Sequence, residues 1–325
     1  MTTESTIQRG HQGTGAQLVV LIVIAAVLLR GVLDSWFDGP AIQAWSTVFV
    51  SIILQATPFL ALGVALSAAV AAFVPAERLT RLLPKNRVAA VATGGAAGVL
   101  LPGCECGAVP ISGRLVSAGA LPGAALAFML AAPAINPVVL VSTAVAFPGR
   151  PEMVMGRLVA SLITAVVMGL LVLRINADGL VRRAMSRRHV GDSKWETFAV
   201  TARHDFLQAG GFLVLGSAAA ALLQVAVPRS FLVNIGESAG LGLLMMAVLA
   251  IALSICSEAD AFVAASFTQV SPTAQLAFMV VGPAVDLKLA SMQAGVFGSR
   301  FAVRFAPATA LVAVAAAAVV GGVLL

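Results

Sequence analysis

Two cysteines and a glutamate lie together in one segment of the chain that is poorly suited to a regular helix. The segment reads Leu101-Pro-Gly-Cys-Glu-Cys-Gly-Ala-Val-Pro110 and lies between long apolar runs. Proline removes a backbone donor and glycine weakens helix interiors, so a continuous helix is disfavoured here. A carboxylate and unpaired backbone groups are costly in hydrocarbon unless they line a cavity or find protein partners. Cys104, Glu105 and Cys106 are therefore predicted to belong to a binding site.

The composition indicates where this segment is located. Of the 325 residues 60% are hydrophobic and only 10% are charged, whereas a soluble domain has roughly a quarter of its residues charged. We therefore predict an all-α polytopic membrane protein, multi-pass in the cell (cytoplasmic) membrane and in contact with the lipid bilayer. The net charge of +6 does not indicate nucleic acid, because the basic residues cluster in short loops between apolar runs, as they do where loop charge orients a membrane protein.

A spanning helix needs about 20 mostly apolar residues, and runs of this kind divide the chain into four parts. Residues 1–44 are predicted to be an N-terminal tail and a first transmembrane helix, the latter over Ala16–Leu33. The first transmembrane repeat follows over 45–173 and the second over 205–325. Residues 174–204 between them are strongly basic, which predicts a cytoplasmic linker.

The term repeat rests on two internal matches. Residues 54–75 and 207–228 are identical at 11 of 22 positions, and residues 122–136 and 272–286 are identical at 8 of 15. Shared glutamine, phenylalanine, glycine and proline positions make chance similarity between two alanine-rich stretches an insufficient explanation. We predict two internal repeats with discontinuous or re-entrant helices.

Loop charge predicts the relative direction of the repeats. The turn at 78–87 carries four basic residues, whereas the equivalent turn after Val227 has only Arg229, with Glu237 nearby. Positive loops stay in the cytoplasm, so the two repeats are predicted to be inverted, an arrangement found in transporters with a site near the bilayer midplane. Parallel repeats are the alternative. Residues 88–118 form either a re-entrant hairpin or one broken crossing.

The duplication predicts that several interrupted segments converge on one pocket. It aligns Cys106 with Cys256, and Asn136 with Asp286. The predicted substrate-binding residues are Cys104, Glu105, Cys106, Asn136, Cys256 and Asp286, with Gln55 and Gln208 on the paired leading helices. Thiolates prefer soft ions, so Cys104, Cys106 and Cys256 are also the predicted ligands for a soft metal or metalloid. Glu258 and Asp260 are predicted to couple transport to protons, because buried carboxylates tend to take up a proton.

Structural alternatives exist for most of these residues. Isolated membrane cysteines are commonly small buried hydrophobes. Asp286 can pair with Lys288, two residues further on, and the two glutamines can hold helices together. Arg114 is expected to snorkel to the cytoplasmic surface.

A family resemblance follows from two motifs. Cys104-Glu-Cys106-Gly-Ala-Val-Pro110 and the later Ala-Pro-Ala-Ile-Asn136-Pro137 resemble the signature of the ArsP/YraQ-type predicted permeases, with similarity from about Trp45 to the C-terminus. Glu105 stands where such proteins often have a small or polar residue. The resemblance implies a permease of the cytoplasmic membrane, some members of which export trivalent organoarsenicals.

Together these features predict a secondary transporter for a small solute, with no cofactor. The specific form is proton-coupled export of a trivalent organoarsenical or another thiophilic species. The chain has no Gly-rich phosphate loop ending in Lys-Ser/Thr, so it is not predicted to be an ATPase or another enzyme. One alternative is a membrane thiol oxidoreductase that uses the Cys-x-Cys pair. Another is a membrane subunit of a larger transport complex, and assembly as a homo-oligomer is left open.

Overall fold

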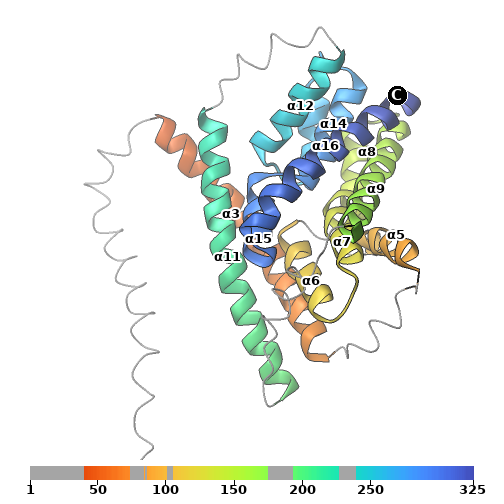
Figure 1. Ribbon diagram of the computed structural model, residues 1–325. Coiled ribbons are helices and arrows are strands. Elements are labelled where there is room, and N and C mark those ends of the chain that lie inside the picture. The colour runs from red at the N-terminus through yellow and green to blue at the C-terminus, as the bar shows by residue number, and fades with distance from the viewer. Residues whose placement is uncertain (1–39, 74–83, 85, 101–104, 175–192, 227–238) are drawn as a thin grey trace, which may run out of the picture. The chain divides into compact units, whose positions relative to one another are not determined.

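A computed structural model describes residues 40–73, 84, 86–100, 105–174, 193–226 and 239–325, and all regular structure within these ranges is helical (Figure 1). The predicted helix at Ala16–Leu33, the basic turn at 78–87 (apart from 84, 86 and 87) and Cys104 lie outside them. The chain divides into two compact units, Met1–Thr47 and Val48–Leu325. The contacts given below are those of the second unit.

The helices are, in chain order, α3 (Pro40–Phe73), α5 (Arg87–Ala97), the 3₁₀ turn η1 (Gly98–Leu100), α6 (Glu105–Ser117), α7 (Pro122–Ile135), α8 (Pro137–Ala146), α9 (Pro151–Arg174), α11 (Lys194–Ala226), α12 (Ala239–Leu253), α13 (Asp260–Ser266), α14 (Pro272–Ala284), α15 (Leu287–Phe297) and α16 (Ser299–Leu324). Helix α11 begins inside the segment that we assigned to the linker.

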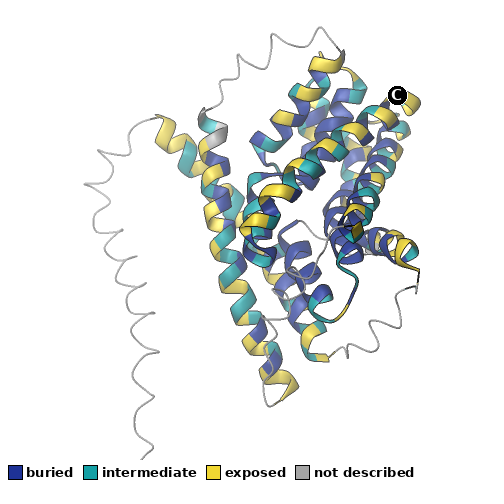
Figure 2. Cartoon of the chain, in the orientation of Figure 1, coloured by how far each residue is buried: buried dark blue, intermediate teal, exposed yellow. Residues whose placement is uncertain are grey.

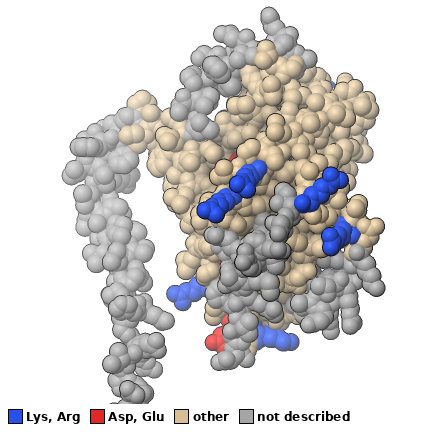
Figure 3. Space-filling view, viewed as in Figure 1, with Lys and Arg blue, Asp and Glu red and all other residues tan. Residues whose placement is uncertain are grey.

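Six stretches of the described residues are long and apolar enough to span a membrane. They are Pro40–Phe73, Pro122–Ala146, Pro151–Arg174, Lys194–Leu222, Pro272–Phe297 and Ser299–Leu324. The face of the molecule drawn in Figure 3 is largely uncharged, with few Lys or Arg side chains. The prediction of an all-α polytopic membrane protein is therefore confirmed.

Two of the six spans are broken in the middle. Helices α7 and α8 are separated at Asn136, and α14 and α15 at Val285 and Asp286. Each of α7 and α14 begins with a proline, which is suited to the first helical turn. In the apolar 18-residue stretch of each broken span, 78% and 83% of the residues are buried, a far larger share than in the other four spans (Figure 2). They form the centre of the unit.

Glycine contacts define the directions of the helices. On α3 the Cα of Gly63 lies against Gly107, and Ser67 donates to the carbonyl of Pro110, so α3 and α6 run in the same direction. The ring of Phe73, at the end of α3, lies 5.3 Å from that of Trp195, at the start of α11. We call this end of the unit, where α3 and α6 end and α11 begins, the linker face.

The other helices follow from this assignment. Gly123 near the start of α7 packs on Gly169 near the end of α9, so α7 starts and α9 ends at the linker face. Gly321 near the end of α16 packs on Thr273 at the start of α14. These two helix ends lie at the opposite end of the unit, which we call the far face.

Two hairpins enter the unit from opposite ends. Helix α5 runs alongside α7 from the linker face, with Gly94 on Ala124, and α6 returns toward that face. Helix α12 begins at the far face, where Gly242 lies near Val270, and α13 returns there. For residues 88–118, the opposite directions of α5 and α6 favour the hairpin over one broken crossing.

Candidate functional site

Three charged side chains meet in the middle of the unit. The Lys288 Nζ lies 2.6 Å from Glu105 Oε1 and 3.4 Å from Asp286 Oδ2. All three side chains are at most 4% exposed. We call Glu105, Asp286 and Lys288 the central charge cluster. The cluster connects α6, which precedes the linker, to α15, which follows it.

The breaks in the helices place these groups. Glu105 is the first residue of α6, directly after the Pro-Gly segment. Asp286 lies before α15, where its Oδ1 accepts a hydrogen bond from the Leu289 backbone N–H at 2.5 Å, so it caps the helix as Asp and Asn commonly do. A Cβ on Gly216 of α11 would lie 2.8 Å from the Lys288 Cα, which shows how closely α11 packs here.

The cluster has acceptors to spare. Among the described residues, the buried Glu105 Oε2 has no hydrogen-bond donor, and the buried Asp286 Oδ2 has only the Lys288 ammonium group, at 3.4 Å. Buried acceptors without a partner are uncommon and costly, so such groups call for a functional explanation. These oxygens can accept a proton or a donor group of a bound solute.

Two thiols lie beside the cluster. Cys106 and Cys256 are both free and buried, and both interact electrostatically with the Lys288 ammonium group. The Cys256 Sγ donates a hydrogen bond to Glu258 Oε2 at 2.6 Å. The carboxylate is therefore placed to take the thiol proton. Within the described residues, no group of three or more His, Cys, Asp or Glu side chains is arranged to hold a metal ion.

Asn136 is completely buried and serves the backbone at the other break. Its Oδ1 accepts from the Val139 N–H and its Nδ2 donates to the Ala132 carbonyl, both at 3.0 Å. It therefore links the end of α7 to the start of α8. Asp286 caps its own helix in the same manner, with a charge in addition.

Asp260, a predicted proton-coupling residue, is held by an arginine that the sequence analysis did not single out. The Arg157 Nη1 and Nη2 donate to the two carboxylate oxygens of Asp260, each at 2.8 Å. The same guanidinium also donates to Thr143 Oγ1 and to the Ser257 carbonyl. The Arg157 side chain is fully buried. A charge inside the apolar stretch of α9 was the signal that could have identified it.

A second buried ion pair lies on the linker side of the cluster. Arg114 donates to both carboxylate oxygens of Asp205 on α11, at 2.8–3.0 Å. Its side chain is 6% exposed, so the expectation that it snorkels to the surface is wrong. The pair lines a cavity of about 30 Å³ between α6, α11 and α15, which is room for one or two water molecules.

The two predicted glutamines have different surroundings. Gln208 lines this cavity together with Phe212 and Met292. Gln55 is exposed on α3, next to Leu54, which is 71% exposed. Among the residues given a place in the substrate site, the structure therefore brings together Glu105, Cys106, Cys256 and Asp286, with Gln208 a short distance along the same helices.

Comparison with known proteins identifies the family. The model of the ArsP_1 family, described as predicted permeases, matches residues 41–322. The chain belongs to this family of predicted permeases. It is 38% identical to the UPF0718 protein YcgR of Bacillus subtilis (strain 168) over an alignment of 263 residues. The alignment covers 79% of this chain and 90% of that protein.

A second relative is found in Streptococcus mutans serotype c. It is named a putative two-component membrane permease complex subunit and is 32% identical over 282 residues, covering 84% of this chain and 94% of the relative. No solved structure matches the permease. The family and the six apolar spans make the chain a multi-pass membrane permease, and the family favours a transporter over an enzyme.

Proposed function

We propose that the permease is a secondary transporter that binds a small thiophilic solute at the central charge cluster and at the thiols of Cys106 and Cys256. The observation that carries the proposal is a buried charge cluster at the junction of two interrupted helices, α6 and α15, in which Glu105 Oε2 has no donor among the described residues. In a membrane, irregular backbone and charge at this depth are tolerated where they face protein or a cavity.

The helix directions support inverted repeats. Before the linker the order is a long helix, a hairpin that enters from the linker face, a broken span and an unbroken span. After the linker the same order recurs from the far face. Inverted halves that meet at a midplane site permit alternating access.

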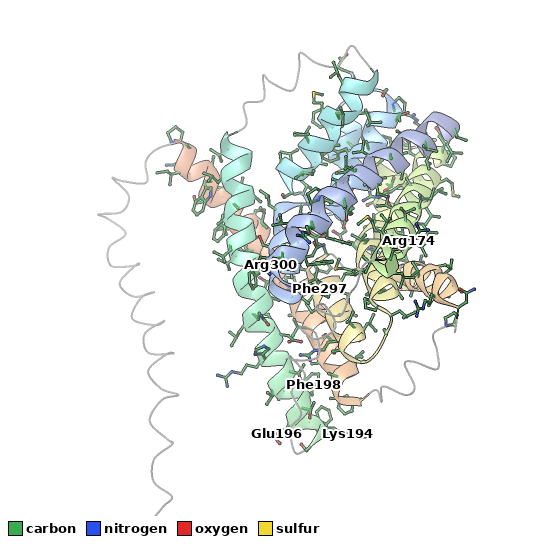
Figure 4. All side chains as sticks on the ribbon, in the orientation of Figure 1. Arg174, Lys194, Glu196, Phe198, Phe297 and Arg300 are labelled. Carbon is green, nitrogen blue, oxygen red and sulfur yellow. The ribbon has the colours of Figure 1, made fainter. Side chains whose placement is uncertain are left out.

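Loop charge supports a cytoplasmic linker face. By the helix directions, most exposed basic residues of the described chain lie on the linker side of their helices. They are Arg87, Arg174, Lys194, Arg203, Arg300 and Arg304. Of those labelled in Figure 4, Lys194 lies at the bottom of the view, and Arg174 and Arg300 lie near its middle. On the far face, Arg150 lies 3.3 Å from Glu152. Positive charge is retained in the cytoplasm, which fits a protein of the cytoplasmic membrane.

The thiols favour a trivalent organoarsenical as the solute. Soft thiol ligands suit a soft metalloid centre. In the reaction, the S–H bond of Cys256 and an As–OH bond break, an As–S bond forms, and the proton and hydroxide leave as water. Arsenic stays trivalent. Glu258, 2.6 Å from the Sγ, takes the thiol proton and delivers it to the leaving hydroxide.

Proton coupling is assigned to Glu258 and to the carboxylates of the cluster. Protonation of Asp260 would remove its charge and disrupt at least one of the two hydrogen bonds from Arg157, whereas Glu105 Oε2 is an acceptor without a donor among the described residues. A proton on Glu105 would release Lys288 toward Asp286. This exchange gives the site two charge states, as a coupled transporter requires.

Uptake into everted membrane vesicles tests the proposal, with trivalent arsenicals, soft metal ions and sulfur oxyanions compared as solutes. We expect arsenical uptake that depends on a proton gradient. Cys106→Ser and Cys256→Ser should each lower it roughly tenfold or more, because a hydroxyl is a poor ligand for a soft centre. Parental uptake by both variants would contradict thiol ligation. The control is Ser291→Ala, which removes a half-buried hydroxyl that donates to the Leu287 carbonyl within α15.

A role as one subunit of a transport complex is the second candidate, because the Streptococcus relative is named as a complex subunit. Purification of the tagged chain from native membranes in mild detergent distinguishes the two. A stoichiometric second membrane protein, required for uptake in reconstituted vesicles, would support the subunit role. Uptake by the purified chain alone would exclude it.

A further inference from the structure

Three buried ion pairs join the part of the chain before the linker to the part after it. They are Arg114–Asp205, Glu105–Lys288 and Arg157–Asp260. In the first and third the arginine comes from before the linker and the aspartate from after it, and two of the three guanidinium nitrogens donate to the carboxylate. Bidentate pairs of this kind are both strong and strict in geometry.

The broken span α14–α15 shows the depth of each pair. On the far side, Asp260 Oδ2 lies next to Gly282, four residues before Asp286. On the linker side, Arg114 and Asp205 share their cavity with Met292 and Gly295, four to seven residues after Lys288. At 1.5 Å per residue of helix, the linker-side pair lies about 6–10 Å from Lys288 along this span. The far-side pair lies at the last turn of α14, on the opposite side of the break.

The helices that carry the pairs must move if the central site is to open. The Arg114–Asp205 pair connects hairpin helix α6 to α11, and the Arg157–Asp260 pair connects α9 to hairpin helix α13. Opening a path to the linker face therefore separates the first pair. Opening a path to the far face separates the second.

We propose that these pairs are the two gates of the transporter: Arg114–Asp205 closes the central site toward the linker face, and Arg157–Asp260 closes it toward the far face. In this structure both gates are closed. The linker-side gate borders a cavity, whereas the far-side gate is tied in addition to Thr143 and to the Ser257 carbonyl. The linker-side gate is therefore the one that opens more readily.

The inference rests on the proposed transport function, but its test needs no solute. Cys106 serves as a reporter in a Cys104→Ser/Cys256→Ser background, in membrane vesicles of both orientations, with an epitope tag between residues 175 and 192 to read which face is outside. The rate of reaction with a membrane-impermeant methanethiosulfonate is measured from each face. Arg114→Gln/Asp205→Asn should raise this rate roughly tenfold from the linker face only, and Arg157→Gln/Asp260→Asn from the far face only.

Double neutral variants are used because they leave no unpaired buried charge, so the fold is retained. The charge-swapped Arg114→Asp/Asp205→Arg should restore slow labelling. Arg150→Gln/Glu152→Gln, which removes an exposed pair, should change neither rate. The proposal is overturned if a double variant accelerates labelling equally from both faces or if either leaves labelling at the parental rate. Failure of transport with correct labelling would instead count against the proposed solute.

Discussion

The Arg157–Asp260 pair and the central charge cluster are both buried ionic groups, yet they differ in how completely they are hydrogen-bonded. Arg157 makes four hydrogen bonds, and both oxygens of Asp260 receive one. In the central cluster, Lys288 contacts one oxygen of each carboxylate, at 2.6 Å for Glu105 Oε1 and 3.4 Å for Asp286 Oδ2, and among the described residues Glu105 Oε2 has no donor.

The difference in hydrogen bonding distinguishes an ion pair that fixes the positions of two helices from a site that can bind a solute. A buried ion pair with nearly all its hydrogen bonds made has one favoured geometry, and removing one partner leaves an uncompensated charge. A cluster with free acceptors retains a capacity for protons or for polar groups of a solute. We therefore assign the first to closure of the transporter and the second to the solute.

The largest effect on stability is expected when the Arg157–Asp260 pair is broken. Asp260→Ala leaves Arg157 as a buried charge, which should destabilise the protein by about 3–5 kcal/mol. The change is measured as a lower midpoint of thermal unfolding in detergent and a lower folded yield. Arg157→Gln/Asp260→Asn should recover most of the loss. If the single variant is as stable as the parent, the pair does not have the role that we assign to it.

Neutralising the cluster should give the opposite balance of effects. Glu105→Gln removes one partner of Lys288 but leaves Asp286, so the expected stability loss is only about 1.5–3 kcal/mol. Uptake of the solute should nevertheless fall to background. Unfolding and uptake are measured on the same preparation. A stable variant with parental uptake would show that Glu105 is not part of the solute site.

The residues of the central cluster are easier to predict from the sequence than the Arg157–Asp260 pair. Hydropathy and loop charge predicted the all-α membrane class, and the Pro-Gly break pointed to Glu105 and Cys106. The internal match paired Asn136 with Asp286, and both residues do cap helices after a break. These features are local, so a single sequence contains them.

Partners from distant segments were not predictable in the same way. Nothing near Asp260 in the sequence indicates Arg157, because their contact depends on how α9 packs against α13. For the same reason the exposed position of Gln55 could not be separated from that of Gln208, although both occupy matching places in the internal repeat. Pairing across the unit requires tertiary structure, and local patterns do not encode it.

Asn136 and Asp286 cap helices in the same way, so substitutions at these two residues separate the effect of the cap from the effect of the charge. Asn136→Ala removes a cap and should cost about 1 kcal/mol, with uptake by the folded protein close to that of the parent. Asp286→Asn keeps the cap but removes the charge next to Lys288, so it should lower uptake severalfold with a small change in unfolding temperature. Unfolding curves and uptake rates for both variants test this. Equal losses of uptake would show that the break geometry, and not the charge, is what matters.

The smallest expected effect concerns a polar side chain that belongs to neither group. Gln55 is exposed on α3, so Gln55→Leu should change stability by no more than about 0.5 kcal/mol and leave uptake unchanged. Gln208→Leu, the matched substitution on α11, alters the cavity beside Arg114 and should slow uptake. Because the two glutamines occupy matching sequence positions, a different outcome can be caused only by their surroundings. If Gln55→Leu instead dissociates a native oligomer in crosslinking experiments, the α3 surface contacts another chain, and lipid alone does not cover it.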